Sequence, residues 1–221
     1  MLGKTMLRAA MALGVFAVVG TGLVATTYTT TKDRIAQNEH EALLKSLNAL
    51  VPPDLYNNKP TADTMLVRSE ALLGTDEPVT VYRARRDGAP VAAVLTPTAP
   101  DGYNGAIKLL VAINYDGTVM GVRVISHRET PGLGDYVDIE HSDWITGFAG
   151  HSLYTTDARE WAVKRDNGIF DQFTGATITP RAVVKAVYKC LQYFIINRDG
   201  LFNPRVSTTI VEDVTTASDD E

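Results

Sequence analysis

The pattern of hydrophobic and polar positions begins with one long apolar segment. Residues Ala9 to Tyr28 form a stretch of 20 residues without a charge. At about 1.5 Å per residue, a helix of this length spans roughly 30 Å, which is enough for a bilayer core. A cleaved secretory signal is the alternative, but its apolar region is typically about 7–15 residues long. We therefore predict that residues 1–31 hold a short cytoplasmic N-terminus and a retained transmembrane helix.

Residues 32–78 connect this anchor to the part of the chain that carries strands. Apolar residues recur at helical spacing from Asp33 to Val51, and Pro52-Pro53 ends the pattern, which predicts a stalk helix or a first domain helix. Turn-forming residues surround a short apolar piece between residues 54 and 78. We predict irregular structure there, with one short helix at most.

Short runs rich in β-branched residues then predict four strands in two pairs. The dipeptides Asp87-Gly88 and Asp116-Gly117 separate the members of each pair, and both favour tight hairpin turns. The predicted strands cover residues 79–84, 91–95, 107–113 and 119–125.

An amphipathic helix follows the strands. Thr179 suits the N-cap, Pro180 suits the first helical position, and apolar residues continue at helical spacing as far as Leu191. We therefore predict an α+β domain over residues 79–205, in which an antiparallel sheet packs against helices. Residues 206–221 carry five acidic residues and no periodicity, so we expect an acidic flexible tail.

The segment directly before this helix combines small residues with hydroxyl groups. Gly175 and Ala176 leave room beside Thr177 for a phosphate or for the active site of another enzyme. The free N–H groups in the first turn of the following helix favour an anion. These features indicate a phosphate acceptor, although a loop that merely caps a helix has the same pattern. The whole segment reads Asp171-Gln172-Phe173-Thr174-Gly175-Ala176-Thr177.

A second run of glycine and polar residues leaves the last predicted strand. Loops that are held by a rigid scaffold often carry binding residues. By itself, however, this run is better explained as a simple turn. It follows His127 and reads Glu129-Thr130-Pro131-Gly132-Leu133-Gly134.

Together, the two runs resemble motifs of the FMN-binding domains of the Rnf and Nqr respiratory complexes. The pattern Asp-x-x-Thr-Gly-Ala-Thr at residues 171–177 resembles their flavinylation motif. With a single N-terminal membrane segment, the chain most closely resembles the G subunit of the Rnf complex. The resemblance covers the anchor and most of residues 79–195. One departure is Pro180, which stands where relatives often have serine and which fits a helix start.

The resemblance implies a covalent cofactor. A phosphoester would join Thr177 to FMN, which a separate flavin transferase delivers from FAD. Thr174, Gly175 and Ala176 would complete the cofactor-binding turn, and Asp171 would belong to the flavinylation motif that the transferase recognises.

The resemblance also assigns the upstream loop to the flavin ring. Thr130, Leu133 and backbone groups of Gly134 would hold one side of the ring. Glu129 and His127 would orient the loop or contact polar atoms of the ring.

The same resemblance implies a place and partners. The chain would be the electron-carrier subunit of a membrane-bound complex that couples electron exchange between NADH and ferredoxin to sodium or proton transport. Other Rnf subunits would hold the NADH site, iron–sulfur clusters and another covalent flavin. The chain would span the bacterial inner membrane once, with its C-terminal domain in the periplasm. Basic residues flank both ends of the apolar segment, so this orientation rests mainly on the resemblance.

Composition and scattered residues exclude several other classes. A net charge of −5 without a basic stripe argues against nucleic acid as a partner. The four histidines show no ligand spacing, so we predict no metal site. Cys190, the only cysteine, falls on the apolar side of the last helix and is expected to be a small buried thiol. We predict no catalytic residues, because a flavin supplies the electron chemistry itself.

Three further side chains are expected to have no role in the site. Trp144 and Trp161 are expected in the core or at an interface, and Lys164 is expected in solvent.

Two other functions of the chain also stay open at this point. One is a cofactor-free, membrane-anchored periplasmic structural or receptor domain. The other keeps FMN but belongs to a quinone-reducing sodium pump or a standalone sensor.

Overall fold

The computed structural model describes residues 2–203, and the chain divides into two compact units, residues 1–45 and 46–221. The predicted acidic tail, residues 206–221, lies outside the described residues. The first unit is helical. Helix α1 (Leu2–Leu50) runs through it and contributes its last residues to the second unit.

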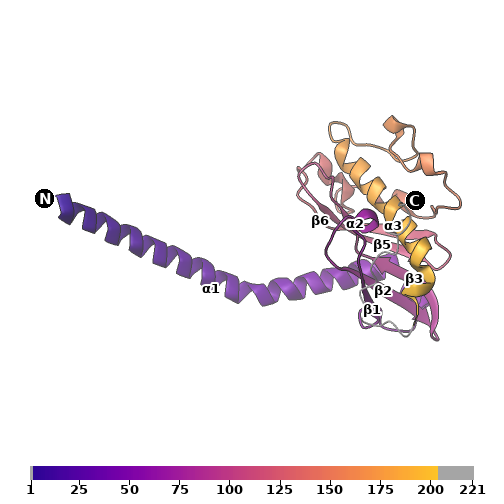
Figure 1. The fold of residues 1–221 in the computed structure, drawn as a ribbon, viewed down its shortest axis with the longest axis horizontal. Helices are drawn as coiled ribbons and strands as arrows, with labels where there is room; N and C mark the ends of the chain where they lie inside the picture. Colours follow the sequence, from indigo (N-terminus) through magenta and orange to yellow (C-terminus); the bar gives the residue numbers. More distant parts are fainter. Residues whose placement is uncertain (1, 204–221) are drawn as a thin grey trace, which may run out of the picture. The chain divides into compact units, whose positions relative to one another are not determined.

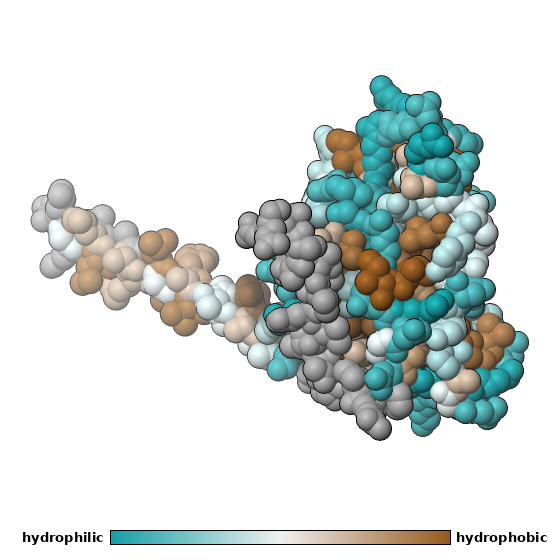
Figure 2. All heavy atoms as spheres, turned by 45° about the vertical axis from the view of Figure 1, so that its right-hand side comes forward, coloured by the Kyte–Doolittle hydropathy of each residue, from teal (hydrophilic) through white to brown (hydrophobic). Residues whose placement is uncertain are grey.

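The first unit contains the predicted membrane helix. Residues Met6–Lys32 are long and apolar enough to cross a membrane, and their large apolar side chains are exposed (Figure 2). A helix that exposes apolar side chains in this way needs an apolar surrounding. The span is slightly longer than the predicted Ala9–Tyr28, and the predicted anchor and stalk form one continuous α-helix.

The second unit is built on a six-stranded antiparallel sheet (Figure 1). The sheet order is β1-β2-β3-β5, and β4 and β6 also pair with β5. All four predicted strands are present, which confirms the α+β class. The strands are β1 (Thr64–Val67), β2 (Val79–Arg86), β3 (Ala89–Leu95), β4 (Thr98–Ala99), β5 (Ile107–Asn114) and β6 (Val119–Ser126).

The sheet begins earlier than predicted. Residues Thr64–Val67 pair with β2, and Glu70–Leu73 form the one-turn helix α2. Ser69 caps α2 by accepting a hydrogen bond from the Leu72 N–H, and Gly74 ends it with φ 72°. An apolar pattern of only four residues does not distinguish a strand from a loop, so the sequence did not reveal this edge strand.

The main core lies between the sheet and helix α3 (Ile178–Leu201) (Figure 1). One face of α3 packs against inward-facing strand residues such as Val81, Leu109 and Val111. Residues spaced three and four apart form one stripe along a helix, which is why the predicted apolar pattern becomes the buried face. That face includes Val183, Val184, Val187, Cys190, Leu191 and Phe194.

The opposite face of the sheet is also covered. Leu47, Leu50 and Val51, at and just after the end of α1, are buried. A Cβ placed on Gly121 of β6 would lie 2.8 Å from Leu50 Cδ2, so α1 ends directly against the sheet within the second unit. Burial on both faces explains why β5 is almost continuously apolar rather than alternating.

In the described residues, five short 3₁₀ helices lie in the connections. One begins at Gly134, the last residue of the glycine-rich loop, and another lies shortly before the acceptor segment. They are η1 (Pro53–Leu55), η2 (Gly134–Val137), η3 (Trp144–Phe148), η4 (Ala158–Glu160) and η5 (Lys164–Asp166).

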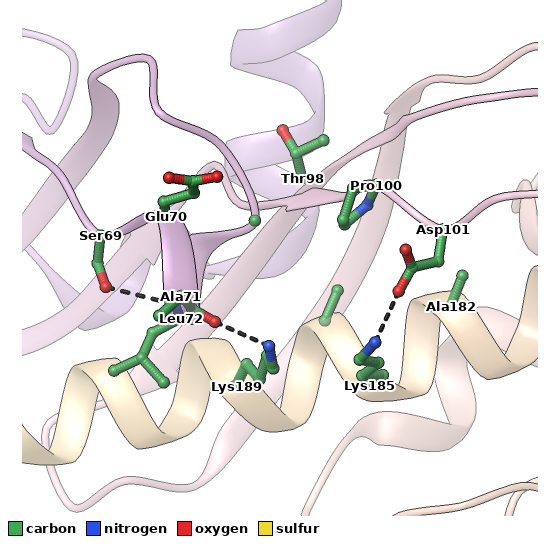
Figure 3. A pocket seen from close by; sticks show the side chains of 12 residues that line it. Ser69, Glu70, Ala71, Leu72, Thr98, Pro100, Asp101, Ala182, Lys185 and Lys189 are labelled. Atoms are coloured by element: carbon green, nitrogen blue, oxygen red, sulfur yellow. Dashed lines mark hydrogen bonds and ion pairs between the residues drawn. The ribbon is translucent and has the colours of Figure 1, made fainter.

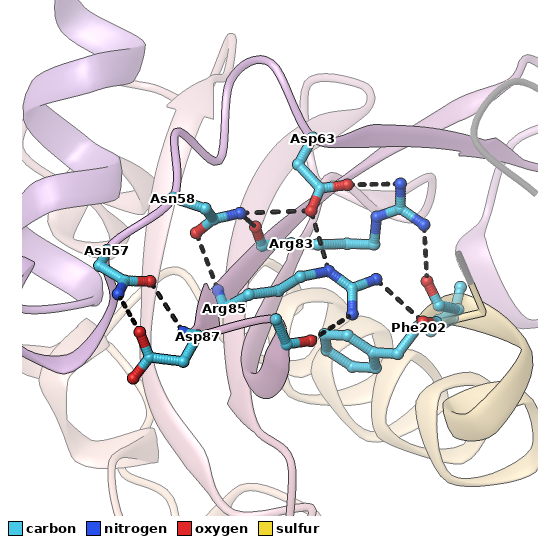
Figure 4. A network of polar contacts seen from close by, with 9 residues as sticks. Asn57, Asn58, Asp63, Arg83, Arg85, Asp87 and Phe202 are labelled. Atoms are coloured by element: carbon cyan, nitrogen blue, oxygen red, sulfur yellow. Dashed lines mark hydrogen bonds and ion pairs between the residues drawn. The ribbon is translucent and has the colours of Figure 1, made fainter. Parts of the chain in front are cut away.

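The C-terminal end of α3 is held by two arginines of β2 (Figure 4). Arg83 donates to the Leu201 carbonyl at 3.2 Å, and Arg85 donates to the Phe202 carbonyl at 2.9 Å. Asp63 pairs with both guanidinium groups at 2.5 and 2.9 Å. The last carbonyls of a helix lack intrahelical partners, so cations stabilise this end of α3.

Cys190 is fully buried on α3, as predicted, and burial raises the pKa of its thiol. The thiolate is the reactive form, so we expect the native protein to react with Ellman's reagent far more slowly than the unfolded protein. The reagent should detect almost no thiol before denaturation and one thiol per chain afterwards. Rapid reaction of a protein that keeps its native circular dichroism would contradict the buried position.

Candidate functional site

The acceptor segment forms a tight turn directly before α3. Thr174 and Gly175 are exposed, whereas Ala176 and Thr177 are half-buried. The Ala176 N–H donates to the Phe173 carbonyl at 3.2 Å, and Gly175 has φ 83°. Residues with a side chain are strained at this φ, which explains the glycine. The turn ends at Thr177, where the helix starts.

Thr177 is the N-cap residue of α3, and its hydroxyl makes no capping hydrogen bond. The helix begins at Ile178, earlier than the predicted first position Pro180. The predicted N-cap, Thr179, is fully buried in the first turn and donates its hydroxyl hydrogen bond to Glu129. The cap prediction was therefore wrong, because a buried carboxylate takes the hydroxyl that would otherwise cap the helix.

Glu129 links the upstream loop to the start of α3. Glu129 is only 5% exposed, and its second carboxylate oxygen accepts a hydrogen bond from the Asn104 N–H at 3.0 Å. The Asn104 side chain donates to the Thr130 hydroxyl at 3.0 Å, and the Glu129 N–H donates to His127 Nδ1 at 3.1 Å. A buried carboxylate needs such partners to offset its desolvation. This geometry favours the orienting role among the two that we predicted for Glu129 and His127.

The loop brings Leu133 and Gly134 to the acceptor turn. A Cβ on Gly175 would lie 3.6 Å from Leu133 Cδ2, so the two sequence runs lie in van der Waals range. Leu133 itself is 43% exposed. A Cβ on Gly134 would lie 2.6 Å from Glu129 Oε2 and 2.9 Å from Thr179 Oγ1. Only glycine fits at position 134 without movement of these groups.

Asp171, at the other end of the acceptor segment, is held by two neighbouring loops. Lys164 Nζ lies 2.6 Å from Asp171 Oδ1, and Trp144 Nε1 donates to the Asp171 carbonyl at 2.8 Å. The Trp144 ring also meets the Phe173 ring edge-on, with 5.2 Å between centroids. The Tyr136 ring also contacts the Phe173 ring, with 5.6 Å between centroids. Lys164 is 57% exposed and Trp144 packs against the core, as expected for each. Both also contact the motif, which we did not predict.

Several of these partners had no signal in the sequence. Asn104 and Thr179 lie 25 and 50 positions from Glu129, and neither belongs to the two runs that we singled out. Hydrogen bonds over such separations follow from the sheet topology rather than from a local pattern. Trp161 is buried in the core, as expected.

A separate hollow of about 460 Å³ lies between α2, α3 and the segment around Pro100 (Figure 3). Lys185 pairs there with Asp101 at 2.6 Å, and Lys189 donates to the Ala71 carbonyl at 2.8 Å. None of the predicted flavin residues lines this hollow. The acceptor turn lies instead on a more open surface.

The arrangement around Thr177 fits an FMN group. The first-turn N–H groups of α3 lie at a helix N-terminus and can receive a phosphate. Leu133 and Tyr136 are both partly exposed and offer apolar surface to a planar ring. The site thus joins a hydroxyl, a position for an anion and an apolar surface next to the N-terminal end of α3.

Comparison with known proteins first assigns the class. Residues 102–192 match the FMN-binding domain, and residues 1–50 match the RnfG N-terminal region. The first match includes the upstream loop and the acceptor segment. The chain therefore contains an FMN-binding domain.

Individual relatives narrow the class to one family. The chain is 50% identical over 191 residues to the G subunit of the ion-translocating oxidoreductase complex of Pseudoalteromonas atlantica. The aligned residues cover 86% of this chain and 89% of the relative. The same subunit of Pseudomonas aeruginosa is 49% identical over 201 residues, with 91% and 94% covered. That of Vibrio atlanticus is 49% identical over 191 residues, with 86% and 91% covered. The chain belongs to the family of G subunits of the ion-translocating oxidoreductase complex, which confirms the resemblance.

The close packing at Gly134 gives a stability prediction. Gly134→Ala should destabilise the domain by about 1–3 kcal/mol, because its methyl group displaces a fixed, buried carboxylate. Gly147→Ala is the control, since nothing lies within 4 Å of a Cβ at that position. It should change the free energy of unfolding by less than about 0.5 kcal/mol. Equal urea midpoints for Gly134→Ala and wild type would contradict the packing around Glu129.

Proposed function

We propose that Thr177 carries FMN through a phosphoester and that the domain is an electron carrier. The observation that carries this proposal is the position of Thr177. It is the N-cap of α3, its hydroxyl is not used for capping, and the N–H groups of the first turn favour an anion there. The exposed turn at Thr174 and Gly175 gives a separate transferase a route to the half-buried hydroxyl.

Attachment from FAD is a transfer without oxidation or reduction. The hydroxyl oxygen of Thr177 forms a bond to the phosphorus on the FMN side of FAD, and the phosphoanhydride bond breaks. AMP leaves with the electrons of that bond, and the hydroxyl proton passes to a base of the transferase or to water. Asp171 is 67% exposed at its side chain, so the transferase can read it directly.

Thr174 is the other hydroxyl of the motif. It lies within the exposed turn, three residues before the N-cap, whereas Thr177 lies at the helix start. A phosphoester on Thr177 therefore gains the interaction with the helix N-terminus that one on Thr174 lacks. Gly175 and Ala176 keep the backbone beside Thr177 free of bulky side chains.

FMN supplies the electron chemistry when it is bound, and the protein supplies its position and surroundings. We assign one side of the ring to Thr130, Leu133 and the backbone of Gly134. Leu133 is suited to this role because it lies next to Gly175 and remains partly exposed. Glu129 acts behind them by fixing the loop.

The relatives are named as subunits of an ion-translocating oxidoreductase complex. We propose that this chain works with the other membrane and peripheral subunits of such a complex, which couples electron transfer between NADH and ferredoxin to sodium or proton transport. A flavin transferase would complete its maturation. The domain after α1 would lie in the periplasm of a bacterium, with the helix in the inner membrane.

The attachment residue is tested by mass spectrometry. Wild-type protein made together with a flavin transferase should gain the mass of FMN less one water and should fluoresce in a denaturing gel. Thr177→Ala should lose both signals and unfold at nearly the same temperature, since the hydroxyl makes no capping bond. Thr174→Ala is the matched control and should retain covalent flavin. Covalent flavin on folded Thr177→Ala protein would exclude this residue.

The orientation is tested with introduced cysteines, because the native Cys190 is buried and should stay silent. Ala158→Cys lies at an exposed position of the second unit, and Gly3→Cys lies near the N-terminus. In spheroplasts, a membrane-impermeant maleimide should label Ala158→Cys and leave Gly3→Cys unlabelled until detergent is added. The reverse pattern would place the domain in the cytoplasm.

A further inference from the structure

The short turn η5 (Lys164–Asp166) contacts the chain on both sides of Thr177. Lys164 pairs with Asp171 at 2.6 Å, six residues before Thr177. Asp166 forms two hydrogen bonds with the Arg181 guanidinium at 2.5 and 2.6 Å, four residues after Thr177. One three-residue turn therefore ties down the chain on either side of the acceptor hydroxyl.

A further contact holds the chain next to Asp171. The backbone N–H of Arg165 donates to Gln172 Oε1 at 3.2 Å. All three residues of η5 thus contact the acceptor segment or the first turns of α3. Among the ion pairs of the described residues, only those of η5 reach residues close to Thr177 on both its sides, Asp171 and Arg181.

The base of η5 is itself rigid. Val163, directly before it, is fully buried, and the Lys164 N–H donates to the Phe170 carbonyl at 2.7 Å. Asn167 ends the turn with φ 65°, and a Cβ on Gly168 would overlap the Ala162 carbonyl. The charged side chains of η5 therefore extend from a fixed backbone rather than from a free loop.

Both ion pairs of η5 are partly exposed to solvent, so they affect the local segment more than the stability of the whole domain. The Lys164 and Asp171 side chains are 57% and 67% exposed, and those of Arg181 and Asp166 are 42% and 39% exposed. Exposed ion pairs contribute little to the stability of a whole domain. Even a small free energy shifts the populations of two conformations of a short segment, however.

We propose that η5 is a clamp that holds the acceptor segment in the conformation in which Thr177 is modified, and that Asp166 and Arg181 are positioning residues for flavin attachment. The proposal rests on the proposed attachment of FMN to Thr177. Transfer requires the hydroxyl at a defined place in the active site of the transferase, and small displacements of a reacting atom are costly. The exposed turn at Thr174 and Gly175 lies between the two clamped ends.

A different role for Arg181 predicts a different result. Arg181 lies one helical turn after Thr177, so its cation could attract the phosphate directly. A clamp needs an ion pair of either polarity, whereas attraction of phosphate needs the positive charge on residue 181. Exchanging the two charges distinguishes the roles, because the pair is kept and the cation moves to position 166.

The test uses the full chain in detergent with a purified flavin transferase and FAD. Initial rates of loading are measured by fluorescence in denaturing gels and by intact mass. Arg181→Asp and Asp166→Arg should each load at least about fivefold more slowly, because each replaces an attraction with a repulsion. The exchanged double variant should return to within about twofold of wild type. Arg159→Asp is the control, since its exposed pair with Asp157 does not touch the acceptor segment.

Two measurements exclude a merely structural effect. The thermal midpoints of all variants should stay close to that of wild type, while backbone hydrogen exchange at residues 174–177 should become faster in the two single variants only. If either single variant fails to fold, Arg181→Gln replaces it, and it should load more slowly than the control variant Arg159→Gln.

Single variants that load at the wild-type rate would overturn the clamp. A double variant as slow as Arg181→Asp would also overturn it and would assign Arg181 to the phosphate. Wild-type protein that takes up no flavin at Thr177 would instead contradict the proposed function, so the two failures are distinguishable.

Discussion

The hydrogen bond between the Thr179 hydroxyl and the buried Glu129 carboxylate fixes the segments around Thr177 relative to one another. Through its two oxygens Glu129 reaches the first turn of α3 and the backbone at Asn104, and its own loop continues to Leu133. Burying a carboxyl group at this depth costs free energy unless such donors are present. The interaction therefore constrains the loop and the helix start together, because a shift of either would leave the buried carboxylate without a hydrogen-bond partner.

The sequence was sufficient to predict the elements whose signals are local. The hairpin at Asp87-Gly88 is a clear case, since the structure gives positive φ angles of 52° and 81° at these residues, as a tight hairpin turn requires. The apolar stripe of α3 and the burial of Cys190 followed from helical spacing in the same way. The short edge strand β1 did not, because four residues carry too little periodicity.

At the candidate site, too, the features with local sequence signals were predictable and those that depend on long-range contacts were not. The acceptor turn and the glycine-rich loop were visible as sequence runs, and the family resemblance gave them a role. The wrong assignment of the N-cap to Thr179 shows the limit of this approach. A threonine before a proline is locally a good cap, but its hydroxyl bonds to a carboxylate 50 positions away. Such competition depends on which segments the sheet brings together, and no pattern within the helix reveals it.

Arg83 and Arg85 bind the C-terminal end of α3, and the length of this helix places that end far from the acceptor turn at its N-terminal end. Helix α3 has 24 residues, so Thr177 and the described end of the chain are roughly 36 Å apart along its axis. A fluorescent protein, an affinity tag or a surface tether joined after the C-terminal end of α3 would start far from the acceptor turn. Immobilisation through this end should therefore leave the flavin side of the domain open, which suits electrochemistry on the isolated subunit.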